Sequence, residues 1–175
     1  MNDVPVSPFG VSRATPDQWR AARAARLRAL AAEPDRFGVS LLSEEARTAG
    51  EWREQLAQQS WFLARHRADG AVAGLAVFYP DDTFPDGAPQ LGAMWVDPVY
   101  RGRGVARELA VAVEEAAGEV GADAVGLWVT VGNDRARDVY AHLGYALTGA
   151  TKPAPRDPAV AMHRMIKRRL APPLA

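Results

Sequence analysis

The sequence predicts a single-domain α/β fold with a central mixed, mostly antiparallel sheet. The chain has 175 residues, 48% hydrophobic and 24% charged, which suits one globular domain. Short apolar runs alternate with helix-periodic runs along its whole length. One such unit, strand–helix–strand over 91–131, requires two parallel strands, whereas tight hairpins elsewhere require antiparallel ones. Counting the runs gives six to seven strands and about four helices.

Two helices are expected after a first strand. Thr15-Pro16-Asp17-Gln18 is typical of a helix start, with a threonine cap, proline at the first position and glutamine completing a capping box. That helix runs to about Ala32. Arg23 and Arg26 lie on the same helix face as its apolar residues. The second helix is expected from Ser43 towards Gln59.

A hairpin and the strand–helix–strand unit follow. The apolar runs 61–66 and 71–79 flank Asp69-Gly70, a dipeptide typical of tight hairpin turns. A polar loop over 80–89 precedes the next strand. The remaining elements are expected to be strand 91–96, helix 105–118, strand 125–131, helix 134–143, strand 145–148, a proline-rich loop 152–158 and strand 159–166.

Composition excludes several classes of function. Lysine plus arginine and aspartate plus glutamate both number 21, so nothing general favours nucleic acid or an anionic membrane as partner. The absence of cysteine removes disulfides, thiolate metal sites and a cysteine nucleophile, and three scattered histidines give no metal-ligand spacing. The first ten residues do not resemble a signal peptide and no run is long enough to span a membrane. We therefore expect a cytoplasmic protein without a metal.

The most informative segment is the short basic loop between strand 91–96 and helix 105–118. It reads Val96-Asp97-Pro98-Val99-Tyr100-Arg101-Gly102-Arg103-Gly104-Val105-Ala106. A strand entering a helix through such a loop leaves several backbone N–H groups unpaired at the positive end of the helix dipole. The segment therefore predicts an anion site, most often one for phosphate.

Two phosphate-binding loops fit poorly. A nucleoside-triphosphate loop needs a lysine followed by a serine or threonine, and neither is present. A dinucleotide loop needs a third small residue where Arg107 stands, and an acidic residue at the end of the next strand, whereas Asp123 precedes that strand.

A third loop fits in its own sequence and in its surroundings. Arg101-x-x-Gly104-x-Ala106 resembles the signature of the GNAT superfamily of acyl-CoA-dependent N-acetyltransferases. Upstream, Met94 to Arg101 looks like the fourth strand and its exit. Downstream, Leu127-x-Val129 and Asn133-x-x-Ala136-x-x-x-Tyr140-x-x-x-Gly144-Tyr145 look like the fifth strand, fourth helix and glycine–aromatic turn. Trp19, Arg26 to Leu30 and Pro34-Asp35-Arg36-Phe37-Gly38 also resemble a common opening. The resemblance covers about 9–168 of a single domain 1–175.

The resemblance implies a fold, a reaction and a donor. Strands 4 and 5 would be parallel and splayed, and acetyl-CoA would donate its acetyl group to a primary amine by direct attack in a ternary complex. The acceptor would be a small molecule or a peptide, and the protein a monomer or homodimer. A non-catalytic acyl-CoA-binding or sensing module on the same fold remains the alternative.

The resemblance also implies which residues bind coenzyme A. The amides of Arg103, Gly104, Val105 and Ala106 would hold the pyrophosphate, and Gly102 would permit its close approach. Met94, Trp95 and Val96 would border the pantetheine arm where the two strands part. The side chains of Arg101, Arg103 and Arg107 would each add positive charge there, unless that side chain is simply solvated.

Tyr140 is the expected catalytic acid. Asn133, Ala136 and Tyr140 share one helix face, and a phenol can protonate a departing thiolate, an effect worth about 10²–10⁴-fold. The other interpretation of Tyr140 is a packing residue. Asn133 is expected to contact the cofactor or a water near the thioester, to cap the helix, or both.

The general base and the acceptor are not identified by the sequence. Many relatives carry a glutamate on the fourth strand, but 91–96 contains no acid. A water chain, Glu51, Glu54, Asp81 or Asp82 remain as alternatives. Trp95 and Trp128 would either wall the acceptor site or belong to the core. Acceptor choice would depend on the loops at about 32–43, 80–90 and 149–158.

Overall fold

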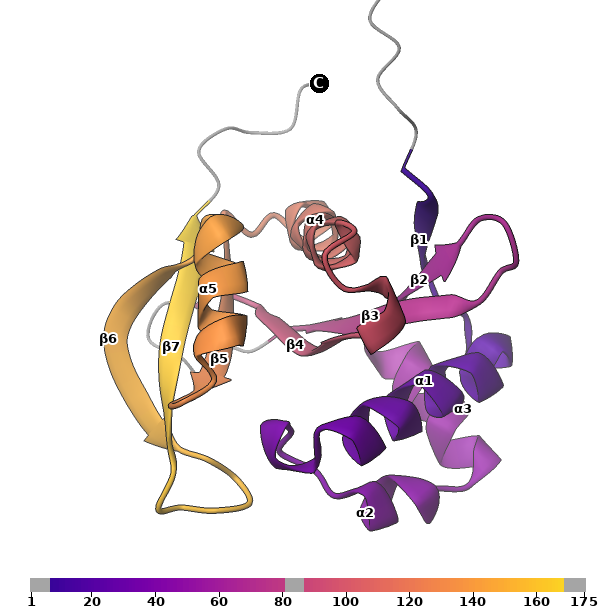
Figure 1. Ribbon diagram of the computed structural model, residues 1–175, viewed down its shortest axis with the longest axis horizontal. Helices are drawn as coiled ribbons and strands as arrows, with labels where there is room; N and C mark the ends of the chain where they lie inside the picture. The colour runs from indigo at the N-terminus through magenta and orange to yellow at the C-terminus, as the bar shows by residue number, and fades with distance from the viewer. Residues whose placement is uncertain (1–6, 81–86, 169–175) are drawn as a thin grey trace, which may run out of the picture.

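A computed structural model describes residues 7–80 and 87–168 of the chain. One mixed seven-stranded sheet, in the order β1-β2-β3-β4-β5-β7-β6, forms the middle layer. Helices α4 and α5 lie on one side of it and α1, α2 and α3 on the other (Figure 1). The strands are β1 Phe9–Arg13, β2 Ser60–His66, β3 Val72–Tyr79, β4 Gln90–Val96, β5 Ala124–Thr130, β6 Ala146–Pro153 and β7 Ala161–Arg168. The helices are α1 Trp19–Ala32, α2 Leu41–Glu45, α3 Ala49–Gln58, α4 Val105–Glu119 and α5 Asp134–His142, with 3₁₀ turns at Pro16–Gln18, Pro34–Arg36 and Pro98–Tyr100.

The predicted single helix over 43–59 is wrong: the chain forms two helices there. Ser40, not Ser43, caps α2, where its hydroxyl accepts a hydrogen bond from the Ser43 amide. Thr48 then caps α3, in a capping box with Glu51. In each cap the side chain accepts a hydrogen bond from an amide that a continuous helix would have bonded internally. Because Thr48 begins α3 in this way, α2 ends before it.

The C-terminal hairpin also differs from the prediction. Strand β6 runs to Pro153, although a loop was expected from residue 152, and β7 begins at Ala161 rather than Ala159. Pro153 pairs with Ala161, and the next residue still bonds across the hairpin, because the Ala154 amide donates to the Val160 carbonyl at 2.7 Å. The described residues form five α-helices, close to the predicted number of about four, and three 3₁₀ turns. The polar loop 80–89 lies mostly outside the described residues.

Strands β4 and β5 are the parallel pair, and they separate almost immediately. Within the described chain their register contains one pair, Gln90 with Gly126, beside a hydrogen bond from the Gly126 amide to the Pro89 carbonyl. The buried Arg164 guanidinium of β7 donates to Gln90 Oε1 at 2.6 Å. Beyond this point the two strands diverge, which confirms the predicted splay.

A β-bulge reshapes β4 beside that opening. Leu75 pairs with Trp95 but Val77 pairs with Gly92, so β4 has one residue more than β3 between these pairs. Ala93 takes up the excess in the left-handed region, at φ 52°. An L-residue adopts this conformation at a cost of about 1–2 kcal/mol. The bulge therefore turns the backbone of β4 at the place where β5 has departed.

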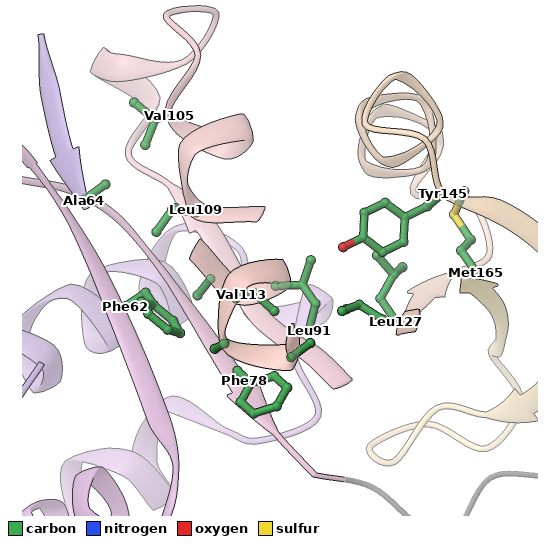
Figure 2. Packing of buried hydrophobic residues seen from close by; sticks show 14 of the residues in the cluster. Phe62, Ala64, Phe78, Leu91, Val105, Leu109, Val113, Leu127, Tyr145 and Met165 are labelled. Carbon is green, nitrogen blue, oxygen red and sulfur yellow. The ribbon is translucent and has the colours of Figure 1, made fainter. Parts of the chain in front are cut away.

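The two faces of the sheet have separate cores. On the α4 side, Val105, Leu109 and Val113 pack with residues from both parts of the sheet, including Leu91, Leu127 and Met165 (Figure 2). On the α1–α3 side, the buried cluster extends over β2, β3 and β4 only and contains no residue of β5, β6 or β7. The two parts of the sheet are thus joined across the β4–β5 opening by a shared core on the α4 side only.

Candidate functional site

The opening between β4 and β5 forms a cleft of about 690 Å³, here named the main cleft. Its walls come from β4, the loop before α4, the first turn of α4, the end of β5, one face of α5 and the segment after α1. The cleft brings together every sequence-predicted site residue except Arg103, which lies outside its lining. The predicted residues that line it are Met94, Trp95, Val96, Arg101, Gly102, Gly104, Val105, Ala106, Asn133 and Tyr140.

The loop before α4 has the geometry of an anion site. Gly102 and Gly104 have φ of 75° and 88°, values that favour glycine, and Gly104 is the N-cap of α4. The backbone amides of residues 102–107 donate no hydrogen bond to any described residue. The first intrahelical bond runs from the Glu108 amide to the Gly104 carbonyl. Unpaired amides and the helix dipole therefore meet at one end of the main cleft.

Arg101 braces the loop. Its Nε donates to the Val96 carbonyl at 2.9 Å, and its guanidinium pairs with Glu33 at 2.7 Å. The pair ties the exit of β4 to the end of α1. Glu33 is the only carboxylate among the described residues that line the main cleft, and this pair engages it.

Asn133 and Tyr140 lie together on the α5 wall. Asn133 Oδ1 accepts the Ala136 amide at 3.3 Å, so the residue caps α5 while it lines the cleft. The Tyr140 ring packs edge-on against Tyr145 at 6.0 Å between centroids. Burial raises the pKa of the Tyr140 phenol above its usual value of 10. The phenol thus keeps its proton throughout the neutral range.

The two tryptophans considered for the acceptor site differ in position. Trp95 is only 3% exposed, belongs to the core beneath α1, and also borders the main cleft. Trp128 borders the main cleft and a second cavity beside it, with the Lys152 ammonium 4.4 Å from its ring centroid. Trp128 therefore stands at the junction of the two spaces, whereas Trp95 is mainly a core residue.

The carboxylates considered as a general base lie elsewhere. Glu51 is engaged in the capping box of α3, and Glu54 accepts a hydrogen bond from Gln58 on the same exposed helix face. Neither lines the main cleft. Asp81 and Asp82 lie outside the described residues.

Sequence reasoning missed part of the lining. Arg36 and Phe37 close the cleft from the segment after α1, and Arg135 and His142 add to the α5 wall. Phe37 stands in the segment Pro34 to Gly38 that carried the resemblance, which was the available signal. The sequence contains no such signal for Arg135 and His142, because only the packing of α5 decides which of its polar side chains face the main cleft.

Two searches of the described residues gave negative findings. No helix there is long and apolar enough to cross a membrane. Likewise, no group of three or more histidine, cysteine, aspartate or glutamate side chains in 7–80 and 87–168 could hold a metal ion.

Comparisons with known proteins agree with this architecture. A GCN5-related N-acetyltransferase from Kribbella flavida is 24% identical, covers 92% of this chain and 98% of its own, and superposes with a TM-score of 0.69. Ribosomal-protein-S5-alanine acetyltransferase from Vibrio fischeri is 14% identical over 97% of this chain and 98% of its own, with a TM-score of 0.77. A putative acetyltransferase from Salmonella typhimurium, solved with acetyl-CoA, is 16% identical over 95% and 98%, with a TM-score of 0.66.

At these identities the solved structures show the fold alone. No curated protein matches the sequence. The model of the acetyltransferase (GNAT) family, however, matches residues 24–145, which include β4, the anion loop and α5. The chain therefore belongs to the GNAT acetyltransferase family.

Proposed function

We propose that the protein is an N-acetyltransferase that moves the acetyl group of acetyl-CoA to a primary amine. The observation that carries the proposal is the main cleft itself. It joins an amide-lined anion loop at one end, two parted parallel strands in the middle and a protonated phenol on α5. Family membership gives the reaction class, and the cleft supports the assignment of roles.

The donor would lie along the cleft. The amides of Arg103, Gly104, Val105 and Ala106 would bind its pyrophosphate, with Gly102 leaving room beside them. Backbone groups of Met94 and Val96 would face the pantetheine arm, which takes the place of a missing strand between β4 and β5. The Arg103 side chain lies outside the lining, so its contribution would come from its backbone.

Tyr140 would act on the leaving group. The amine nitrogen bonds to the carbonyl carbon of the thioester, the carbon–sulfur bond breaks, and sulfur leaves with the electron pair. The phenol would give its proton to that sulfur, and the nitrogen would return one proton to the phenol through water. The chain has no cysteine to carry the acetyl group, so direct transfer in a ternary complex is the expected route.

The proposal is tested by thiol release from acetyl-CoA with a panel of amines. Tyr140→Phe keeps the ring packing and should lower kcat by about 10²–10⁴-fold with little change in the KM for acetyl-CoA, because only the proton donor is lost. Tyr145→Phe is the matched control. Its hydroxyl donates to Glu114 at 3.2 Å outside the cleft, so its kcat should stay near the wild-type value. Equal kcat in all three proteins would contradict the role of Tyr140.

A non-catalytic acyl-CoA-binding or sensing module is the second candidate. It is favoured by the absence of an acid on β4 and by the pairing of Glu33 with Arg101, which together leave no unpaired carboxylate in the described lining of the cleft. Tight coenzyme A binding without turnover of any amine in the panel would favour the sensor. Failure to bind coenzyme A would contradict both candidates.

A further inference from the structure

A second cavity, here named the side cavity, opens next to the β4 bulge. It has a volume of about 340 Å³, in the range of small-molecule sites. It shares Gly92, Ala93 and Trp128 with the main cleft, and it extends from there between the sheet and α1–α3. A molecule held in the side cavity can therefore reach the bulge, which directly precedes the part of β4 that would face the pantetheine arm in the proposed function.

The described lining of the side cavity is strongly basic. Three arginines, Arg26, Arg36 and Arg47, line it together with a single carboxylate, that of Glu44. Glu44 Oε1 is 3.5 Å from Arg47 Nε, so this acid is already used within the cavity wall. The remaining positive charge favours a ligand with an anionic group.

Arg26 is the group that most needs a partner. Its side chain lies on the inner face of α1, is 7% exposed, and stacks its guanidinium over the Phe37 ring at 4.6 Å. Arg26 Nη1 is buried and has no hydrogen-bond partner among the described residues. No ion pair in the described chain joins it to Glu44 or to another acid. Buried cations are normally paired, so an open N–H here indicates a place for an acceptor from outside the chain.

Glu44 and Gln55, which also line the side cavity, each have one buried side-chain oxygen without a partner among the described residues. These atoms are Glu44 Oε2 and Gln55 Oε1, and Glu44 is 3% exposed. The cavity wall thus offers both an unpaired cationic donor and unpaired acceptors. Such a set matches a small polar molecule with an oxyanion and N–H groups and disfavours an apolar or polycationic one.

We propose that the acceptor substrate is an amino acid or a close analogue, whose carboxylate is bound by Arg26 in the side cavity while its amine reaches the β4 bulge. This inference rests on the proposed function.

The inference is tested with the twenty amino acids, their decarboxylated amines and their amides as acceptors. We expect the best acceptor to be a free amino acid, with kcat/KM at least about tenfold above its matched amine and amide, the scale of one charge-assisted hydrogen bond. An amine, an amide or a peptide N-terminus that matches or exceeds the best amino acid would overturn the inference. An aminoalkylphosphonate that is preferred tenfold would overturn the assignment to carboxylate.

Variants of α1 locate the preference. Arg26→Met preserves length and apolar volume and should lower kcat/KM for the amino acid by about 10–100-fold, with the amine and amide within about threefold of wild type. Arg26→Lys should restore part of the preference. Arg23→Met is the matched control, because Arg23 lies one turn earlier, donates to the Glu45 carbonyl and lies outside both cavities. If Arg26→Met keeps the preference for the amino acid, the inference is overturned. If the variant does not fold, the comparison of amino acids, amines and amides with the wild-type protein decides whether the inference holds.

Equilibrium binding separates this inference from the proposed function. Calorimetric titration of amino acids and their amides into the coenzyme A-saturated protein needs no turnover. Carboxylate-dependent binding that Arg26→Met weakens, found without any transfer, would support the side-cavity site and contradict the transferase. Transfer to amines with no dependence on carboxylate would do the reverse.

Discussion

Tyr140 is a partly buried residue that packs against the core on the α4 side and lines the main cleft. Burial raises the pKa of the phenol because the phenolate would be poorly solvated against Tyr145 and the core on the α4 side. The protonated form, which is the acid, therefore persists to pH values above 10. If Tyr140 is the acid, as proposed, its ionisation should lower activity only above its raised pKa.

This shift predicts the shape of the pH profile. At saturating substrates, kcat should rise as the bound ammonium loses its proton, and it should then stay level to at least about pH 10, the ordinary pKa of a phenol. Steady-state rates from pH 6 to 10 measure it. Tyr140→Phe should give the same shape at lower kcat. A descending limb near pH 8–9 that disappears in Tyr140→Phe would contradict a raised pKa.

Gly104 is held at φ 88° where the loop enters α4, and Gly121 is held at φ 75° just beyond the other end of the same helix. A Cβ at either position would meet no other atom within 4 Å, so only the backbone conformation opposes alanine. Both Gly104→Ala and Gly121→Ala should lower the free energy of unfolding by about 1–2 kcal/mol. Urea unfolding measures both.

Only one of these substitutions should affect the donor. Relaxation of strain at Gly104 displaces the amides of the anion loop, so Gly104→Ala should also weaken coenzyme A binding about tenfold or more, whereas Gly121→Ala should leave the Kd unchanged. Isothermal titration of coenzyme A gives both values. Equal Kd values for the two variants would show that the loop amides do not bind the donor.

The joint between β4 and β5 depends on a buried side chain from a third strand. Arg164, 1% exposed, reaches from β7 under Gly126 to Gln90, and its guanidinium lies 5.5 Å from the Trp128 ring centroid. Glycine at 126 leaves the space that the guanidinium occupies, because a Cβ there would overlap it. The position at which β4 and β5 separate therefore depends on the Arg164 guanidinium, which packs against the backbone of Gly126.

Gly126→Ala should displace Arg164 and lower the free energy of unfolding by about 3 kcal/mol or more, as expected when a buried cation loses its hydrogen bonds. At Gly50, a helical position, an added Cβ would meet nothing closer than Thr48 Oγ1 at 3.8 Å. Gly50→Ala should therefore raise the free energy of unfolding by up to about 1 kcal/mol. Chemical unfolding followed by tryptophan fluorescence compares the two. Equal effects would mean that Arg164 moves aside without cost.

The sequence predicted these elements well wherever the information is local. Three such features are present in the structure: the Thr15 capping box, the Asp69-Gly70 turn and the glycine loop before α4. Each of them is formed by residues that are close together in the sequence. The Thr48–Glu51 box was equally local and was overlooked, which produced the error of one long helix.

Other features have no local signal. The bulge at Ala93 uses an alanine in a conformation that alanine disfavours, because pairing with β3 on one side and the departure of β5 on the other impose it. Arg26 was placed beside the apolar face of its helix. That it is buried without a partner follows only from the packing of α2 and Phe37 around it.

At the scale of the whole molecule, the sheet consists of two parts, β1–β4 and β5–β7. Beyond the Gln90–Gly126 pair, they are held together mainly by the core on the α4 side, where Val113 and Leu91 meet Leu127 and Tyr145 (Figure 2). The opposite face has no core shared by the two parts, and the main cleft, lined by α4, α5 and the segment after α1, opens between them. A ligand in that cleft touches both parts at once, so its binding stabilises their association.

Coenzyme A should therefore stabilise the protein in a localised pattern. At a free concentration of 100 times Kd, binding adds about 2.7 kcal/mol, which corresponds to a rise in Tm of roughly 5–10 °C for a chain of this size. Amide hydrogen exchange should slow most in α5 and in the first turn of α4, which line the cleft, because opening between the two parts then requires release of the ligand. Helix α3 packs on the face away from the anion loop and contributes no residue to the main cleft, so it serves as the internal control. Uniform slowing over α3, α4 and α5 would indicate global stabilisation alone, and unchanged exchange in α5 would place the ligand outside the main cleft.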